Sequence, residues 1–341
     1  MTFPFPKILS FLLILGLFPI ELNVNSISPD IITEQTPHDT DDPAIWVNKD
    51  DPSKSLVFGT DKRNSDGAIY AFDLEGKIIE EKTLRGIQRP NNVDVHYDFP
   101  IGKSKKVDLL AFTERGKKQV RLFSVPDMKP LDNGGFKVFQ DEEDSEFRKP
   151  MGISFYRSPS TGEFYLIVGR KKGPREEYLY QYKLLAKNSK VRLELVRKFG
   201  NFSGVKEIEA IAVDDDKGYV YYSDEGVGIR KYHAEPSKGS EEILCFGNGL
   251  FKKDVEGIAI AEHEDGKGFV IVSNQQNDTF NVFSRGNNTF IKEIALGSDD
   301  SDGCEVVVMP LNSTFSSGLF VAMNDERNFF FYDYAKLGLV E

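Results

Sequence analysis

The segment KEIEAIAVDDDKGYVYYSDEG, residues 206–226, reads as two short strands joined by a polar turn. Apolar residues dominate the first strand, aspartates and a glycine mark the turn, and tyrosines and valine favour extended structure in the second. Glu209 stands at the entrance of the first strand and Glu225 just past the exit of the second. Because these positions lie at the same end of an antiparallel pair, the segment predicts two carboxylates side by side at one mouth of a hairpin.

The same pattern recurs along the chain at intervals of roughly fifty residues. Each copy has an apolar strand, a polar turn, a second strand and an aromatic-rich third strand, as in DDPAIWVNKDDPSKSLVFGTDKRNSDGAIYAFDLEG, residues 41–76. Six copies predict an all-β fold, a six-bladed β-propeller with four-stranded antiparallel blades. Fourth strands are expected in KIIEEKTL (77–84), VRLELVRKF (191–199), EEILCFG (241–247) and TFIKEIAL (289–296).

The ends of the chain bear on how the propeller closes. The sixth copy of the pattern reaches Glu341 without a segment that could form a fourth strand. We therefore expect a strand from residues 25–36 to complete the last blade and leave no unpaired edge. No proline- or glycine-rich linker divides the chain. Residues 25–341 are therefore expected to form a single propeller domain, with two sandwich domains as the alternative.

Residues 1–24 carry one lysine and an apolar run from Ile8 to Ile20. That run is short for a membrane span and suits the hydrophobic region of a signal peptide, or an uncleaved N-terminal anchor. We therefore expect an exported protein, secreted or periplasmic. In that setting Cys245 and Cys304, the only cysteines, either pair or remain two buried thiols.

The formal net charge of −11 at pH 7 argues against general nucleic-acid binding, which needs clustered Lys and Arg in excess. No later apolar run is long enough to span a membrane. We expect a monomer that acts on a small molecule.

Polar residues gather at the two places of each copy that propeller geometry brings to one mouth of the central channel. At the start of the first strands stand Asp41, Asp42, Asn92, Asp94, Glu209, Asp254, Glu256, Asp302 and Glu305. Just after the second strands stand Lys62, Arg63, Arg115, Lys171, Lys172 and Glu225. Packed carboxylates raise one another's pKa unless cations compensate them. Oxygen donors with no histidine or cysteine nearby suit Ca²⁺.

At these residues the chain resembles the β-propeller phytases, the alkaline, calcium-dependent 3-phytases. The resemblance is carried by DDPAIW (41–46), NNVDVHYDFP (91–100), EAIAVDDDKGYVYYSDE (209–225), DVEGIAI (254–260), SDG (301–303) and GLFVA (318–322). It runs in order along nearly the whole chain after about residue 38. It implies a six-bladed propeller that hydrolyses phytate, myo-inositol hexakisphosphate, with several bound Ca²⁺ ions.

The resemblance also assigns roles to individual residues. The catalytic carboxylates would be Glu209, Glu225, Asp254 and Glu256. The calcium ligands would be Asp42, Asn92, the Val93 carbonyl, Asp94, Glu209, Glu225, Asp254, Glu256 and Asp302. The residues that bind substrate phosphate would be Lys62, Arg63, Arg115 and Lys171, with Arg63 where the family usually has lysine.

Three positions depart from the family pattern. Met151 stands where the family has a tyrosine in the mouth, which removes a hydroxyl able to touch a metal or a phosphate. The Asp-rich loop before the last blade is shortened to GSDDSDG (297–303), and MNDERN (323–328) replaces a metal loop. These changes put a metal site and catalytic efficiency in question, not the fold.

The expected reaction is calcium-dependent hydrolysis of a phosphomonoester, phytate first, by a metal-activated water attacking phosphorus in line. Two other functions stay open. Propeller lactonases and esterases also place calcium carboxylates at the channel mouth, although they have less use for four basic groups. A non-catalytic propeller that binds a partner or a polyanion would fit Met151 and the shortened loop.

Overall fold

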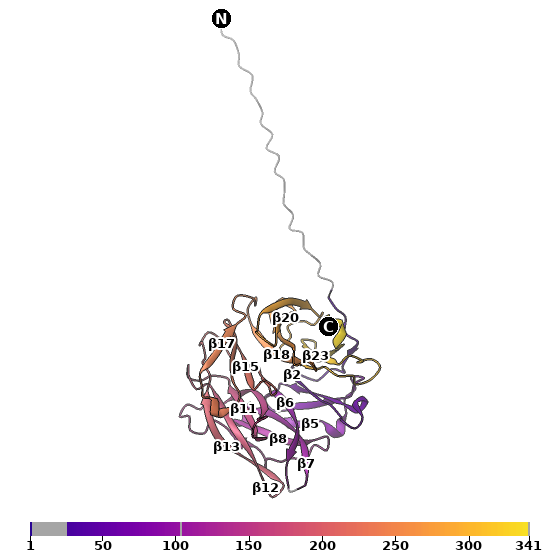
Figure 1. Ribbon diagram of the computed structural model, residues 1–341. Coiled ribbons are helices and arrows are strands. Elements are labelled where there is room, and N and C mark those ends of the chain that lie inside the picture. Colours follow the sequence, from indigo (N-terminus) through magenta and orange to yellow (C-terminus); the bar gives the residue numbers. More distant parts are fainter. Residues whose placement is uncertain (2–25, 103, 340–341) are drawn as a thin grey trace.

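The computed structural model describes Met1, residues 26–102 and residues 104–339. The strands of the described residues from Ile31 onward form a ring of six four-stranded antiparallel sheets (Figure 1). The predicted signal peptide or anchor, residues 1–24, lies outside the described part except for Met1. None of the helices in that part is long and apolar enough to cross a membrane.

The blades follow one another in sequence, so the colours of Figure 1 run once around the ring. The first strands, which pack against one another around the axis, are β2 (Thr40–Trp46), β6 (Pro90–Pro100), β10 (Pro150–Arg157), β14 (Ile211–Asp214), β18 (Val255–Glu262) and β22 (Cys304–Val307). The second strands are β3 (Leu56–Asp61), β7 (Lys106–Glu114), β11 (Phe164–Arg170), β15 (Tyr219–Asp224), β19 (Gly268–Asn274) and β23 (Leu319–Asn324).

The outer half of each blade is built the same way. The third strands are β4 (Gly67–Phe72), β8 (Gln119–Val125), β12 (Leu179–Lys187), β16 (Gly228–His233), β20 (Thr279–Ser284) and β24 (Asn328–Asp333). The fourth strands are β5 (Leu84–Ile87), β9 (Phe136–Lys137), β13 (Lys190–Phe199), β17 (Glu242–Phe246), β21 (Phe290–Ala295) and β1 (Ile31–Ile32). The helical turns, all of the 3-10 type, are η1 (Pro52–Lys54), η2 (Glu80–Lys82), η3 (Arg115–Lys117), η4 (Pro236–Lys238), η5 (Gln275–Asn277) and η6 (Tyr334–Leu337).

The N-terminal strand closes the ring, as the sequence predicts. Ile31 pairs with Phe331 and Ile32 with Phe330, so β1 becomes the fourth strand of the last blade. One expected fourth strand is wrong in its position. Residues 80–82 of KIIEEKTL form η2, and the strand begins only at Leu84, because three charged residues in a row offer no apolar face to a sheet.

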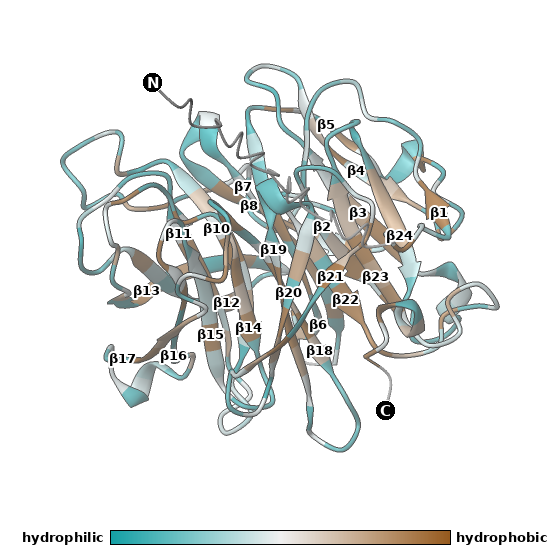
Figure 2. Ribbon diagram, turned by 90° about the horizontal axis from the view of Figure 1, so that it is seen from above, coloured by the Kyte–Doolittle hydropathy of each residue, from teal (hydrophilic) through white to brown (hydrophobic). Residues whose placement is uncertain are grey.

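The core lies between blades rather than in one central mass. Among the residues that the structure describes, six apolar clusters can be traced, and each joins the facing sides of two neighbouring blades. Figure 2 shows the same division, with hydrophobic strands and hydrophilic connecting loops. Cys245 on β17 and Cys304 on β22 are both free thiols, which settles the open question of their pairing.

Irregularities at one end of the first strands shape the mouth of the channel. Four first strands shift register against their second strands near that end, between Thr40 and Pro43 in β2 and at the matching places in β6, β10 and β18. Such bulges re-aim side chains and are frequent beside active sites. The skipped residues, at 41–42, 91–92, 151–152 and 256–257, include four of the polar groups that the sequence places at the mouth: Asp41, Asp42, Asn92 and Glu256.

Candidate metal centre and phosphate site

Carboxylates of the fourth and fifth blades converge at the mouth. One group comprises Glu207, Glu209 and Glu225, and a second comprises Glu225, Asp254 and Glu256; within each group, one oxygen from each residue lies within 4.8 Å of the others. Glu225 belongs to both groups, so it joins them into one cluster. We call these five residues the carboxylate cluster.

Local backbone structure explains why the cluster is so tight. Glu209 lies two residues before β14, the first strand of the hairpin, and Glu225 immediately follows β15, the second. The Ser223 N–H donates to the Ala210 carbonyl at 3.2 Å, which holds the two ends of the hairpin together. The next blade supplies Asp254, just before β18, and Glu256, in its bulge.

Two glycines let neighbouring blades approach closely beside these carboxylates. A Cβ on Gly152 would lie 2.2 Å from the Glu209 carbonyl oxygen. A Cβ on Gly257 would lie 2.7 Å from the Asp302 carbonyl oxygen, which accepts a hydrogen bond from the Gly257 N–H at 2.5 Å. Any side chain at either position would push the blades apart and open the cluster.

Burial makes the cluster costly to ionise without a cation. Loss of hydration, followed by the charges of Asp41 and Asp302, raises the pKa of Glu209 above its ordinary value. Loss of hydration and the charges of Glu209 and Glu225 raise the pKa of Glu256 well above its ordinary value. Glu256 is 4% exposed, and its Oε2 has no hydrogen-bond partner among the described residues. An unpartnered buried oxygen among carboxylates fits a hard, oxygen-seeking cation.

Lys206, which the sequence analysis did not single out, contacts the cluster from its solvent side. Its Nζ lies 2.7 Å from Glu225 Oε2 and 2.5 Å from Asp254 Oδ2. Burial opposes the charge, but the two carboxylates raise the pKa of Lys206 above its ordinary value. Glu207, also missed, forms an ion pair with Lys171.

A second group of charges lies where the last blade meets the first. The Lys62 ammonium is 3.2 Å from Asp41 Oδ1, 2.9 Å from Asp302 Oδ2 and 3.8 Å from Asp39 Oδ2. The Lys62 side chain is only 13% exposed. The structure therefore holds this predicted phosphate ligand among carboxylates that already neutralise it.

The other predicted phosphate ligands are arranged unequally. Arg115 is largely buried, its guanidinium contacts the Met151 sulfur, and its Nε has no hydrogen-bond partner among the described residues. Burial lowers the pKa of Arg115 despite the nearby charge of Glu209. Arg63 is exposed and lies 3.7 Å from Asp66, so the structure does not bring it into the cluster.

The remaining predicted calcium ligands line the central channel. A cavity of about 390 Å³ there is bordered by Asp42, Asn92, Val93, Asp94 and Glu305. Asp42 Oδ2 accepts a hydrogen bond from the Val93 N–H at 3.0 Å. Burial raises the pKa of Asp94 to about 6 and that of Glu305 to about 8.

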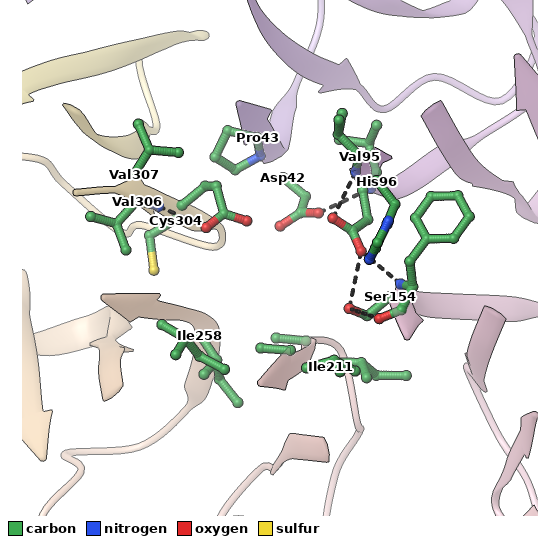
Figure 3. Close-up of a pocket in the computed structure, with 18 of the residues that line it drawn as sticks. Asp42, Pro43, Val95, His96, Ser154, Ile211, Ile258, Cys304, Val306 and Val307 are labelled. Atoms are coloured by element: carbon green, nitrogen blue, oxygen red, sulfur yellow. Dashed lines mark hydrogen bonds between the residues drawn. The ribbon is translucent and has the colours of Figure 1, made fainter. Parts of the chain in front are cut away.

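The channel cavity has a polar and an apolar side. In Figure 3, Asp42 faces Ile211 and Ile258 across the space. A second, much smaller pocket is lined by Asp42 of this cavity and by Glu209 and Glu256 of the carboxylate cluster, among others. Asn92 lines both, and its Oδ1 is buried without a partner among the described residues.

The predicted site residues thus fall into three neighbouring places rather than one. The carboxylate cluster holds Glu209, Glu225, Asp254 and Glu256; the blade junction holds Asp302 and Lys62; the channel holds Asp42, Asn92, Val93 and Asp94. Lys206 and Glu207 lie in the irregular segment before β14. Their proximity in sequence to Glu209 is the one signal that could have found them.

The sequence was also compared with known protein families and proteins. The family model described as Phytase matches residues 23–329. A curated 3-phytase of Bacillus subtilis (strain 168) is 30% identical over 304 residues, which cover 84% of this chain and 75% of the relative.

Solved propellers of other proteins are more distant. The β-propeller domain of Cps50 (Swd1) from Myceliophteria thermophila has a TM-score of 0.49 at 11% identity, covering 85% of this chain and 82% of that one. The Dos1 propeller has a TM-score of 0.45 at 13% identity, covering 84% and 66%. The family match, by contrast, extends over most of the residues that build the blades and the mouth. The chain belongs to the phytase family.

Proposed function

We propose that this protein hydrolyses phosphomonoesters, with phytate as the first candidate substrate, and that it does so with Ca²⁺ bound at the channel mouth. As a member of the phytase family, the chain is a phosphoric monoester hydrolase. The observation that carries the proposal is the carboxylate cluster lying beside buried and partly buried basic groups, because a phosphate and its cation need both signs of charge in one place.

The residues fit a calcium-binding role. Glu209, Glu225, Asp254 and Glu256, with Glu207, would supply carboxylate oxygens at the cluster. Asp302 would add one at the blade junction, and Asp42, Asn92, the Val93 carbonyl and Asp94 would serve the channel. A Ca²⁺ ion bound at the cluster would neutralise phosphate charge and lower the pKa of a water molecule.

The chain's basic groups would bind and orient the substrate. Arg115 has a buried Nε with no protein partner and a planar guanidinium, which suits two-point contact with a phosphate. Lys171 pairs with Glu207 at the same mouth, and both side chains are about a quarter exposed. The Lys171 ammonium would turn from Glu207 toward a phosphate bound there. Lys62 would reach a phosphate only by leaving the carboxylates of Asp41 and Asp302, and Arg63 would meet outlying phosphates from the surface.

A substrate panel tests the proposal. The full-length protein, with Ca²⁺ and with a chelator, is offered phytate, a simple aryl phosphate and a lactone. We expect phosphate release from phytate in calcium alone. Lactone opening without phosphate release would favour the esterase reading, and polyanion binding without any turnover would favour a binding propeller.

The second of these alternatives has one observation in its favour. Lys62 and Lys171 are already paired with carboxylates, and Arg115 contacts Met151 where the resemblance leads one to expect a tyrosine. A mouth so compensated could bind a polyanion and leave it intact.

The remaining proposals concern setting rather than chemistry. We propose that residues 1–24 serve as an export signal or anchor, so that the protein acts outside the cytoplasm. We also propose that residues 25–341 form one domain that works as a monomer. The support is that β1 completes the last blade, so the ring closes within one chain.

A further inference from the structure

Lys206 places a positive charge of the chain itself inside the candidate metal centre. Its Nζ lies 2.7 Å from Glu225 Oε2 and 2.5 Å from Asp254 Oδ2. Those two residues, with Glu256, offer oxygens that lie within 4.8 Å of one another. The ammonium and a metal ion would therefore neutralise the same pair of carboxylates.

Lys206 differs from Lys62 in how firmly its side chain is held. The side chain of Lys62 is 13% exposed and has three carboxylates within 4.0 Å. The side chain of Lys206 is 49% exposed and comes from an irregular segment before β14. A half-exposed lysine keeps an easy path into solvent, because its ammonium is rehydrated as soon as it leaves.

We propose that Lys206 is an internal competitor for the divalent cation. It neutralises Glu225 and Asp254 while no ion is bound there, and it moves into solvent when an ion binds. This inference rests on the proposed calcium site and adds what sets its affinity. The larger the fraction of molecules in which Lys206 is paired with Glu225 and Asp254, the lower the apparent affinity of the site for Ca²⁺. Lys206 therefore sets the calcium concentration at which the site assembles.

The test compares calcium binding to the full-length protein and to Lys206→Met, which keeps the length of the side chain and removes its charge. Binding is followed by calorimetric titration with Ca²⁺, on the binding step that Glu225→Gln removes. Lys206→Met should lower the Kd of that step about five- to tenfold, the range of a partly exposed ion pair made with two carboxylates. Lys206→Arg keeps the charge and should stay near the wild-type Kd.

Two matched lysines control for charge alone. Lys253→Met removes an exposed charge next to Asp254 in sequence, for which no ion pair is found among the described residues. Lys49 lies on the turn between β2 and β3, and Lys49→Met breaks its exposed 2.7 Å pair with Asp98 of β6. Each should change the Kd less than twofold.

Melting temperature gives a second readout that does not depend on turnover. In chelator, Lys206→Met should melt below the wild type, because Glu225 and Asp254 then repel each other uncompensated. In saturating Ca²⁺ the two proteins should melt together, so the calcium-induced shift is larger for the variant. Equal shifts, or a Kd of Lys206→Met within twofold of the wild type, would overturn the proposal.

The outcomes separate this inference from the proposed function. Tighter calcium binding by Lys206→Met, with no phosphate release from the wild type, contradicts the proposed hydrolysis alone. Calcium-dependent phosphate release with an unchanged Kd contradicts the role of Lys206 alone. If neither protein binds Ca²⁺, both are wrong.

Discussion

Replacement of Glu305 by glutamine should stabilise the metal-free protein at alkaline pH. Glu305 lies on β22 and lines the channel cavity. Burial, followed by the charge of Asp94, raises its pKa from 4.5 to about 8, although a hydrogen bond from the Val306 N–H opposes the change. The folded state therefore binds more protons than the unfolded state between these two values. It follows that the free energy of unfolding falls as pH rises from about 4.5 to about 8.

The structure bounds the size of the effect. Each pH unit between the two pKa values is worth about 1.36 kcal/mol, which gives a ceiling of about 5 kcal/mol for Glu305. Solvent in the adjoining cavity and relaxation of the site reduce this, so we expect about 2 kcal/mol. Glutamine can keep the bond that Glu305 Oε1 accepts from the Val306 N–H at 2.7 Å, so little is lost in exchange.

Urea unfolding in chelator, at pH 5 and at pH 9, measures this directly. Glu305→Gln should gain about 2 kcal/mol over the wild type between the two pH values, with an unchanged m value. The surface variant Glu264→Gln should show no such gain, because its carboxylate is exposed. If Glu305→Gln is less stable than the wild type at pH 9, the carboxylate is held as an anion and the reasoning fails.

Three further predictions follow from the mouth. Arg115→Ala should raise KM for phytate, and should lower kcat by roughly a hundredfold if the buried guanidinium stabilises charge in the transition state. Steady-state kinetics measure both constants, with calcium binding expected to stay unchanged. Unaltered KM and kcat would contradict this role of Arg115. Ca²⁺ should raise the Tm, since a ligand at a hundredfold excess over its Kd stabilises by about 2.7 kcal/mol; equal melting curves in calcium and chelator would count against the site. Gly152→Ala should cost about 1–3 kcal/mol of stability and weaken calcium binding, because the new Cβ would lie 2.2 Å from the Glu209 carbonyl oxygen. Normal stability and calcium affinity in this variant would show that the close approach of the blades at Gly152 is not required.

Much of the fold could be predicted because each blade repeats one local pattern. Strand alternation and polar turns locate the first three strands of every copy, and the need to pair the last edge predicts β1. Strand β5 could not be placed, since the charged run Glu80–Lys82 turns before the strand begins. Strand β9, only two residues long, leaves no pattern in the sequence at all.

The candidate site was predictable where it depends on hairpin ends and not where it depends on irregular chain. Glu209 and Glu225 meet because an antiparallel pair must bring them together. Lys206 lies in the irregular segment before β14, where the sequence has no periodic pattern. The direction of its side chain could therefore not be deduced. The contact of Lys62 with Asp302 spans 240 positions and exists only because the ring closes.

The central claim is that the carboxylate cluster, loaded with calcium, hydrolyses phytate. The most direct measurement is phosphate release from phytate by the wild type and by Glu225→Gln, each in saturating Ca²⁺ and in chelator. Glu225→Gln keeps the size of the side chain and removes a charge shared by both groups of the cluster. We expect release by the wild type in Ca²⁺ only, and near-complete loss of release in the variant. Equal release by the two proteins, or release by the wild type in chelator, would contradict it.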